Sequence, residues 1–253
     1  MTTQDKRFAL LIDGDNIASD YIKTILDELA PYGTVTYKRI YGDWTQPNLG
    51  KWKSVLLDYS ITPMQQYAYT SGKNATDSAM IIDAMDILYT GKVDGFCLAS
   101  SDSDFTRLAA RLREAGMTVI GMGKQQTPAA FVAACTEFKF LDILSGEETV
   151  SDPTDDTSTT LLSVEEVKET VRKLIDDNDD IEGADGWVIG SFLIGLIRKT
   201  LPTVDPRYYG GTSKKWIPLL EQWGFPTKRV KNPNNLENEG AVVYIRSDRY
   251  GKT

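Results

Sequence analysis

The chain has 253 residues, of which 41% are hydrophobic and 25% are charged, a composition typical of a folded globular protein large enough for two domains. It contains no histidine, which excludes Ser-His-Asp triads, ribonucleases that use a histidine pair, histidine-ligated zinc and HD-type phosphohydrolases. The formal net charge of −8 argues at first against a nucleic-acid partner.

The charge is distributed unevenly along the chain. Residues 1–147 contain 14 basic and 18 acidic side chains, residues 148–180 contain 3 and 11, and residues 181–253 contain 11 and 7. The acidity is therefore concentrated in the middle of the chain. The last segment is basic, and a nucleic-acid partner for it stays open.

The first 146 residues alternate short apolar segments with segments of helical periodicity. Three of the apolar segments, 8–13, 95–100 and 117–122, are nearly continuous, as in strands that are covered on both faces. The expected strands are 8–13, 34–42, 61–68, 95–100, 117–122 and 139–144. The expected helices are 19–30, 75–89 with Asp77 as a cap, 104–116, and 127–138 with Thr127 as the N-cap and Pro128 as first residue. This alternation predicts an α/β domain with a mostly parallel sheet.

Residues 147–160, EETVSDPTDDTSTT, are acidic and rich in Ser and Thr, and we expect a flexible linker there. The remaining segment, 161–253, shows a helical pattern at 163–178, an apolar segment at 186–200 and a turn segment at 201–216. A second helix at 217–223 and a strand at 241–246 follow. Helices separated by a turn and followed by a strand predict a small C-terminal winged-helix (helix-turn-helix) domain.

The two cysteines, Cys97 and Cys135, lie in apolar segments, where we expect them to be buried and unreactive. No apolar run reaches the roughly 18 residues that a membrane helix needs, and the first residues lack the pattern of a secretory signal. The sequence therefore predicts a cytoplasmic protein without a membrane partner.

Acidic residues stand where the first and fourth expected strands end. The first strand runs into the sequence DGDN at residues 13–16, the fourth into SSDSD at residues 100–104, and a helix begins near Asp77. Ligands of an open parallel sheet bind beyond the carboxyl ends of its strands. We therefore expect one site, and its candidate catalytic residues and metal ligands are Asp13, Asp77, Asp102 and Asp104.

Clustered carboxylates repel one another unless a cation neutralises them. Without histidine, such a cluster favours Mg²⁺ or Mn²⁺ over zinc. One ion can activate water and stabilise charge on a phosphodiester, and two ions could share these tasks. The sequence thus predicts a hydrolase that leaves a 5′-phosphate and a 3′-hydroxyl, because water and not the ribose 2′-hydroxyl attacks.

Other polar residues are candidates for substrate contact. Asn16, Ser101 and Lys73 stand near the aspartates, and each is also compatible with a turn or solvent-exposed role. Asp15 is either a turn residue or a further acidic ligand, whereas Asp83 and Asp86 are expected to face solvent. In the C-terminal segment, basic side chains alternate with aromatic ones as in nucleic-acid surfaces, and the candidate nucleic-acid contacts are Arg207, Tyr208, Lys214 and Lys215. The same basic and aromatic cluster includes Tyr209, Trp216, Lys228, Arg229 and Lys231. We expect Trp187, Trp216 and Trp223 to pack in a core.

Three segments, LLIDGDNI, TDSAMIIDAMD and LASSDSDFTRL, resemble the signature segments of NYN domains, the branch of the PIN-like nuclease superfamily that includes LabA-like proteins. The resemblance spans about 140 residues and implies a PIN-like three-layer α/β/α fold for residues 1–146, with metal-dependent endoribonuclease activity. The matching positions are Asp13, Asn16, Asp77, Asp102 and Asp104. Asp15 stands where the family varies.

The segment DGWVIGSFLIGLIRKTLPTVDPRYYGGTSKKWIPLLEQW resembles the OST-HTH or LOTUS domain. This resemblance implies RNA binding by residues 161–253 and allows an RNA-processing protein as a further partner. A homo-oligomer is also compatible with the sequence.

Three other functions stay open from the residues alone. One is a non-catalytic RNA-binding adaptor in which the acidic pocket is a relic. Another is a phosphatase of the haloacid dehalogenase kind, because a strand that ends in DGD is similar to its DxD motif. The last is a phospho-acceptor signalling domain with an acidic magnesium pocket.

Overall fold

The computed structural model describes residues 6–67, 75–146, 161–178, 186–231 and 241–248. Lys73 and the expected linker, residues 147–160, lie outside these ranges. The chain divides into two compact units, Met1–Thr160 and Leu161–Thr253. No helix among the described residues is long and apolar enough to cross a membrane.

In the described part of the first unit, six strands form one sheet in the order β3-β2-β1-β4-β5-β6, and every neighbouring pair is parallel. The central strands, β1 and β4, are buried over their apolar residues, which explains their continuous hydrophobic sequences. The expectation of an α/β domain with a mostly parallel sheet is confirmed. The strands are β1 (Arg7–Asp13), β2 (Thr34–Gly42), β3 (Thr62–Gln65), β4 (Gly95–Ala99), β5 (Thr118–Gly123) and β6 (Glu137–Phe140).

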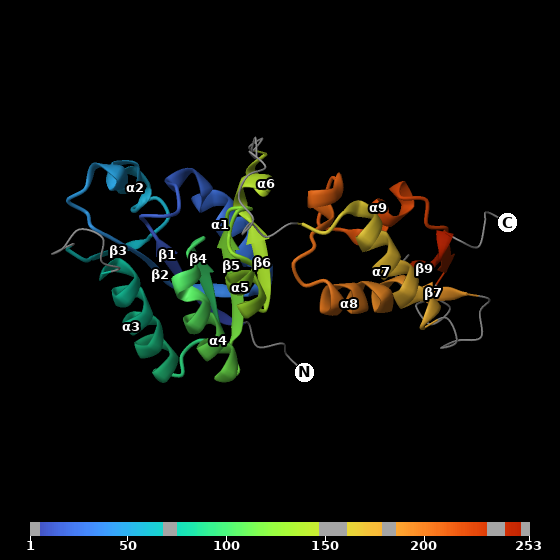
Figure 1. Ribbon diagram of the computed structural model, residues 1–253, viewed down its shortest axis with the longest axis horizontal. Coiled ribbons are helices and arrows are strands. Elements are labelled where there is room, and N and C mark those ends of the chain that lie inside the picture. Colours follow the sequence, from blue (N-terminus) through green and yellow to red (C-terminus); the bar gives the residue numbers. More distant parts are fainter. Residues whose placement is uncertain (1–5, 68–74, 147–160, 179–185, 232–240, 249–253) are drawn as a thin grey trace. The chain divides into compact units, whose positions relative to one another are not determined.

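Helices cover both faces of this sheet, and Figure 1 shows the strands between α1 and the pair formed by α3 and α4. On one face Leu10 and Ile12 of β1 share a core cluster with Ile25 of α1. Because side chains alternate along a strand, Leu11 and Asp13 point to the opposite face, where α3 contacts β1 and β2. The helices are α1 (Ile22–Leu29), α2 (Gly50–Val55), α3 (Ala75–Tyr89), α4 (Thr106–Glu114), α5 (Ala129–Ala134) and α6 (Leu141–Ser145), with short 3₁₀ turns at Ser19–Tyr21, Ala30–Tyr32, Pro47–Leu49 and Ser103–Phe105.

Several expected boundaries are wrong. The expected strand at 139–144 changes into α6 after Phe140, because the buried carboxylate of Asp142 accepts hydrogen bonds from the backbone N–H groups of Gln125 and Ile143. Thr127 does not cap α5, since its hydroxyl donates to the carbonyl of Lys124 at 2.6 Å and the helix begins two residues later. Asp77 is the third residue of α3 and not its cap.

The second unit packs helices against a small antiparallel sheet of order β7-β9-β8 in its described residues. Its first helix starts at a capping box, in which Ser163 and Glu166 bond each other's backbone N–H groups. The strand β8 was not expected from the sequence. The elements are α7 (Val164–Asp176), β7 (Trp187–Ile189), α8 (Gly190–Thr200), the 3₁₀ turn Pro206–Tyr209, α9 (Trp216–Gln222), β8 (Thr227–Lys231) and β9 (Ala241–Arg246).

The core of the second unit joins α7, α8 and α9 to the sheet. It contains Val171 of α7, Leu193 of α8, Leu219 of α9 and Ile245 of β9. Trp216 is buried in it and Trp223 packs against it, as expected. The expectation of core packing is wrong for Trp187, which is half-buried and lies outside this cluster.

Candidate metal centre

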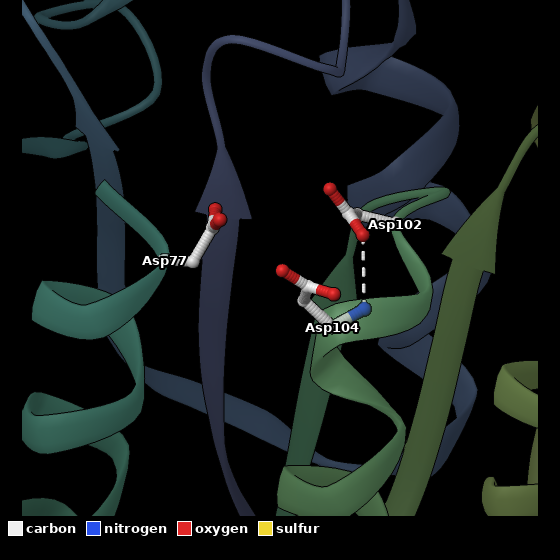
Figure 2. A group of neighbouring side chains, drawn as sticks. All are labelled: Asp77, Asp102 and Asp104. Atoms are coloured by element: carbon white, nitrogen blue, oxygen red, sulfur yellow. Dashed lines mark hydrogen bonds between the residues drawn. The ribbon is translucent and has the colours of Figure 1, made fainter. Parts of the chain in front are cut away.

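Three of the predicted acidic side chains converge at the carboxyl-terminal edge of the parallel sheet. Asp77 comes from the first turn of α3, Asp102 from the loop after β4, and Asp104 from the 3₁₀ turn that leads into α4 (Figure 2). In the described part of the chain these three form one group, in which one carboxylate oxygen from each lies within 4.8 Å of the other two. Asp77 and Asp102 are half-buried and Asp104 is exposed, so the group opens to solvent.

The loop after β4 is held in a fixed shape by its own hydrogen bonds. Asp102 acts as an N-cap, because its Oδ1 accepts from the backbone N–H of Asp104 at 2.9 Å. The backbone N–H of Ser100 donates to Met122 of β5 at 2.9 Å, and this brings the loop against Gly123. A Cβ at Gly123 would lie 2.5 Å from the carbonyl oxygen of Ser100, so only glycine permits this close approach.

Asp13 lies beneath the loop and is 3% exposed. Its Oδ2 accepts from the hydroxyl of Ser100 at 2.7 Å, and the same Ser100 oxygen accepts from the backbone N–H of Asp102 at 3.0 Å. Burial raises the pKa of Asp13 to about 6, the hydrogen bond from Ser100 opposes this rise, and the negative charges of Asp77 and Asp15 add to it. The carboxylate of Asp13 is therefore connected to the acidic group through Ser100 and through charge.

The electrostatics of the group favour a bound cation. Partial burial raises the pKa of Asp77, and the charges of Asp102 and Asp104 raise it further. Three oxygen donors at this spacing fit a hard divalent ion such as Mg²⁺ or Mn²⁺, which binds carboxylates in preference to other protein ligands. The donor set and its charge thus agree with the metal that the sequence predicts.

Two predicted substrate-binding residues, Asn16 and Ser101, connect the loops at this edge. Asn16 Oδ1 accepts from the backbone N–H of Ser101 at 2.9 Å, and the Ser101 hydroxyl accepts from the backbone N–H of Lys124 at 2.8 Å. These bonds link the carboxyl ends of β1, β4 and β5. The structure therefore gives both residues a positioning role beside the candidate metal centre.

A pocket of about 200 Å³ lies next to this centre and is formed by residues 14–20 with Asn48, Lys51 and Trp52. The exposed Asp15 links this pocket to the acidic group. Its carboxylate accepts a hydrogen bond from Asn48 Nδ2 of the pocket at 3.3 Å and one from Thr76 Oγ1 at 3.1 Å, and Thr76 directly precedes Asp77. Lys51 is also exposed. Among the described residues it makes no ion pair, so its ammonium group is available to a ligand in the pocket.

Sequence reasoning missed several residues around this site. Asn48 and Lys51 lie on a short helical segment without a clear apolar period, so no pattern indicated them. Lys124 could have been found, because it directly follows β5 and parallel strands present their carboxyl ends at one edge.

The expectation that Asp83 faces solvent is wrong. Its carboxylate accepts hydrogen bonds from Arg39 and Tyr41 of β2, and its side chain is 16% exposed. Asp83 therefore fastens α3 to the sheet, which positions the first turn of that helix and Asp77 within it. Asp86, in contrast, is exposed as expected.

The candidate RNA contacts of the second unit lie in and after the turn that follows α8. The guanidinium of Arg207 donates twice to the carboxylate of Asp205, at 2.9 and 2.7 Å, and Asp205 is 4% exposed. Tyr208 is half-buried, and Lys214 and Lys215 are exposed just before α9. Arg207 is thus engaged within the unit, and both lysines lie at its surface.

The structure is a parallel α/β protein with a group of three carboxylates, a candidate cation site, at the carboxyl-terminal edge of its sheet. Residues 7–143 match the family model of the NYN domain, and the chain belongs to that family. NYN domains are usually metal-dependent ribonucleases of the PIN-like superfamily, which fits the acidic group.

Two further comparisons add little to this assignment. The crystal structure of a protein of unknown function from Vibrio parahaemolyticus is similar to this chain with 18% sequence identity and a TM-score of 0.47, covering 56% of this chain and 96% of that chain. The search of curated proteins found no match.

Proposed function

We propose that the protein is a metal-dependent endoribonuclease that hydrolyses RNA phosphodiester bonds at the carboxyl-terminal edge of the parallel sheet. The observation that carries the proposal is the convergence of Asp77, Asp102 and Asp104 within a NYN domain. RNA is the expected substrate because the family usually acts on it.

The residues that would hold Mg²⁺ or Mn²⁺ are Asp77, Asp102 and Asp104, with the charge of Asp13 behind them. When bound, such an ion supplies an activated water and neutralises charge on the phosphodiester. Asp13 contributes by fixing Ser100, and Ser100 in turn fixes the backbone of Asp102. The products would carry a 5′-phosphate and a 3′-hydroxyl.

The neighbouring pocket would bind the nucleotide next to the scissile bond. Lys51 places a cation at the wall of this pocket, and Asn48 offers an amide that is already oriented by Asp15. A phosphate or ribose hydroxyl is suited to both groups. Lys124 lies at the same edge of the sheet as a further cation for the RNA backbone.

We further propose that residues 161–253 form a winged-helix module of the OST-HTH or LOTUS kind, joined by the linker at 147–160 to the nuclease domain at 1–146. Three helices packed on a sheet of order β7-β9-β8 in the described residues support this proposal. Lys214, Lys215 and Tyr208 are its candidate RNA contacts. An RNA-processing protein is a further candidate partner of this module, and the cytoplasm is the expected compartment.

The test is cleavage of an end-labelled, partly structured RNA by the purified protein with Mg²⁺, with Mn²⁺ and with EDTA. The proposal predicts internal cuts that need the ion and leave 5′-phosphates. RNA that stays intact in all three samples while still bound would support the adaptor function instead. Release of phosphate from small phosphomonoesters without RNA cleavage would support the phosphatase.

A further inference from the structure

Four side chains gather on the small sheet of the second unit. Lys228 Nζ of β8 lies 4.4 Å from the ring centroid of Trp187 on β7 and 5.3 Å from that of Tyr244 on β9. Arg246 Cζ lies 6.0 Å from the centroid of Trp187. Two aromatic rings and two cations from three different strands are therefore joined by three cation–π pairs. We call the surface that carries Trp187, Lys228, Tyr244 and Arg246 the aromatic sheet face.

The strand register places this face opposite the hydrophobic core. Trp187 pairs with Arg246, and Lys228 pairs with Tyr244. Their neighbours along the chain, Val188 and Ile245, are buried in the core cluster with the helices. Because side chains alternate along a strand, the aromatic sheet face points away from α7, α8 and α9.

The charges on this face are suited to a polyanion. The strands WVI, TKRVK and AVVYIR contain no acidic residue. Arg229, which faces the other way, forms an ion pair with Glu221 of α9 at 2.7 Å. Lys228 is exposed and makes no ion pair among the described residues, and its ammonium lies near the rings of Trp187 and Tyr244. Within the described part of the chain, a ligand phosphate would thus meet a cation that no carboxylate pairs with.

We propose that the aromatic sheet face binds single-stranded RNA, with bases stacked on Trp187 and Tyr244 and phosphates at Lys228 and Arg246. Aromatic side chains on a sheet surface stack on unpaired bases of any sequence, and adjacent cations follow the backbone. A duplex keeps its bases inside and cannot use the rings in this way. The proposal rests on the proposed function for RNA as the substrate class. Of the basic cluster predicted from the sequence, it selects Lys228 on the sheet and not Lys214 and Lys215 in the turn before α9.

The experiment measures binding of the full chain to a fluorescein-labelled oligouridine of about 12 nucleotides by fluorescence anisotropy. EDTA is present throughout, so RNA cleavage cannot affect the anisotropy. Because this measurement does not depend on catalysis, a failure of the nuclease proposal is distinguishable from a failure of the binding proposal. The variants are Trp187→Ala, Trp187→Phe, Lys228→Gln and a double variant that combines Lys214→Gln with Lys215→Gln. Arg229→Gln is the matched control, because it removes a cation from the adjacent residue on the opposite face.

We expect Trp187→Ala to weaken binding roughly 5- to 100-fold, and Trp187→Phe to weaken it less because a ring remains. Lys228→Gln, at an exposed position where folding is not at risk, should weaken binding several-fold and reduce the slope of log affinity against log salt by about 0.7. Arg229→Gln should bind like the wild type. An unlabelled single strand should compete far better than an unlabelled duplex.

Wild-type affinity in both Trp187→Ala and Lys228→Gln would overturn the proposal. So would equal loss in Lys228→Gln and Arg229→Gln, which would indicate a diffuse charge effect. Loss of binding only in the double variant Lys214→Gln and Lys215→Gln would place RNA at the turn before α9 instead. Equal competition by duplex RNA would refute the stacking mode.

Discussion

Replacement of Asp77 by Asn removes one charge from the acidic group and almost no volume. In the metal-free protein, two carboxylates whose oxygens lie within 4.8 Å of Asp77 repel it. Coulomb's law at that distance gives about 0.9 kcal/mol per pair in water and about 3.5 kcal/mol at an effective dielectric constant of 20. Since Asp77 is half-buried and Asp104 exposed, solvent screening reduces the total for both pairs to about 1–2 kcal/mol.

The substitution also removes the favourable interaction of the Asp77 charge with the helix dipole, but this interaction is smaller than the repulsion. Asp77 stands in the first turn of α3, where a negative charge is worth about 0.3–1 kcal/mol against the helix dipole, and Asn and Asp have similar helix propensities. The repulsion therefore wins, and Asp77→Asn should raise the free energy of unfolding of the metal-free NYN domain by about 1 kcal/mol. A substitution that stabilises a protein while removing its activity is typical of a functional site.

Added metal should reverse this order of stability. An ion that binds only the folded wild type at 100 times its Kd contributes about 2.7 kcal/mol, whereas the variant with two carboxylates left should gain much less. The assay is urea unfolding with EDTA and with Mg²⁺ or Mn²⁺, in which the second unit serves as an internal reference. Asp86→Asn is the control, because Asp86 is exposed on the same helix outside the acidic group. If the ion stabilises Asp77→Asn and the wild type equally, the group is not the cation site.

Three further substitutions test the surroundings of the site. Ser100→Ala removes the hydroxyl that joins Asp13 to the backbone of Asp102, so unfolding experiments should show a loss of about 2–4 kcal/mol, and an unchanged midpoint would refute the connection. Lys51→Ala should raise KM for RNA several-fold with little change in kcat, and wild-type KM and kcat would place Lys51 outside the pocket's substrate contacts. Gly123→Ala should displace the Ser100 loop and weaken metal binding measured by calorimetry, whereas wild-type affinity would show that the loop can move away from a Cβ.

The parts that could be predicted from the sequence depend on local patterns. Long apolar runs that stop abruptly identified β1 and β4, and the polar residues directly after them identified Asp13, Asp102 and Asp104. The alternation of such runs with helical periods identified the parallel sheet. These signals are contained within about ten residues each, so they need no knowledge of distant partners.

The parts that could not be predicted depend on pairings between distant residues. Nothing near Asp83 indicates that Arg39 and Tyr41, more than 40 positions away, will pair with it. The segment WVI is too short to show which face of β7 turns inward, and Trp187 was assigned to the wrong one. The apolar run at 139–144 continues as a helix because the Asp142 carboxylate accepts a hydrogen bond from the backbone N–H of Gln125, 17 positions earlier in the chain.

The central claim is that the aspartate group performs metal-dependent RNA hydrolysis, and Asp102→Asn tests it most directly. Asn keeps an Oδ1 that can accept from the backbone N–H of Asp104, so the loop stays capped while the charge is lost. The measurement is the single-turnover rate of RNA cleavage with Mn²⁺ for wild type, Asp102→Asn and the control Asp86→Asn, beside RNA affinity in EDTA. The account predicts that Asp102→Asn lowers the single-turnover rate at least about 100-fold, while Asp86→Asn keeps the wild-type rate. The RNA affinity in EDTA should be the same for all three proteins. Cleavage by Asp102→Asn at the wild-type rate would contradict it.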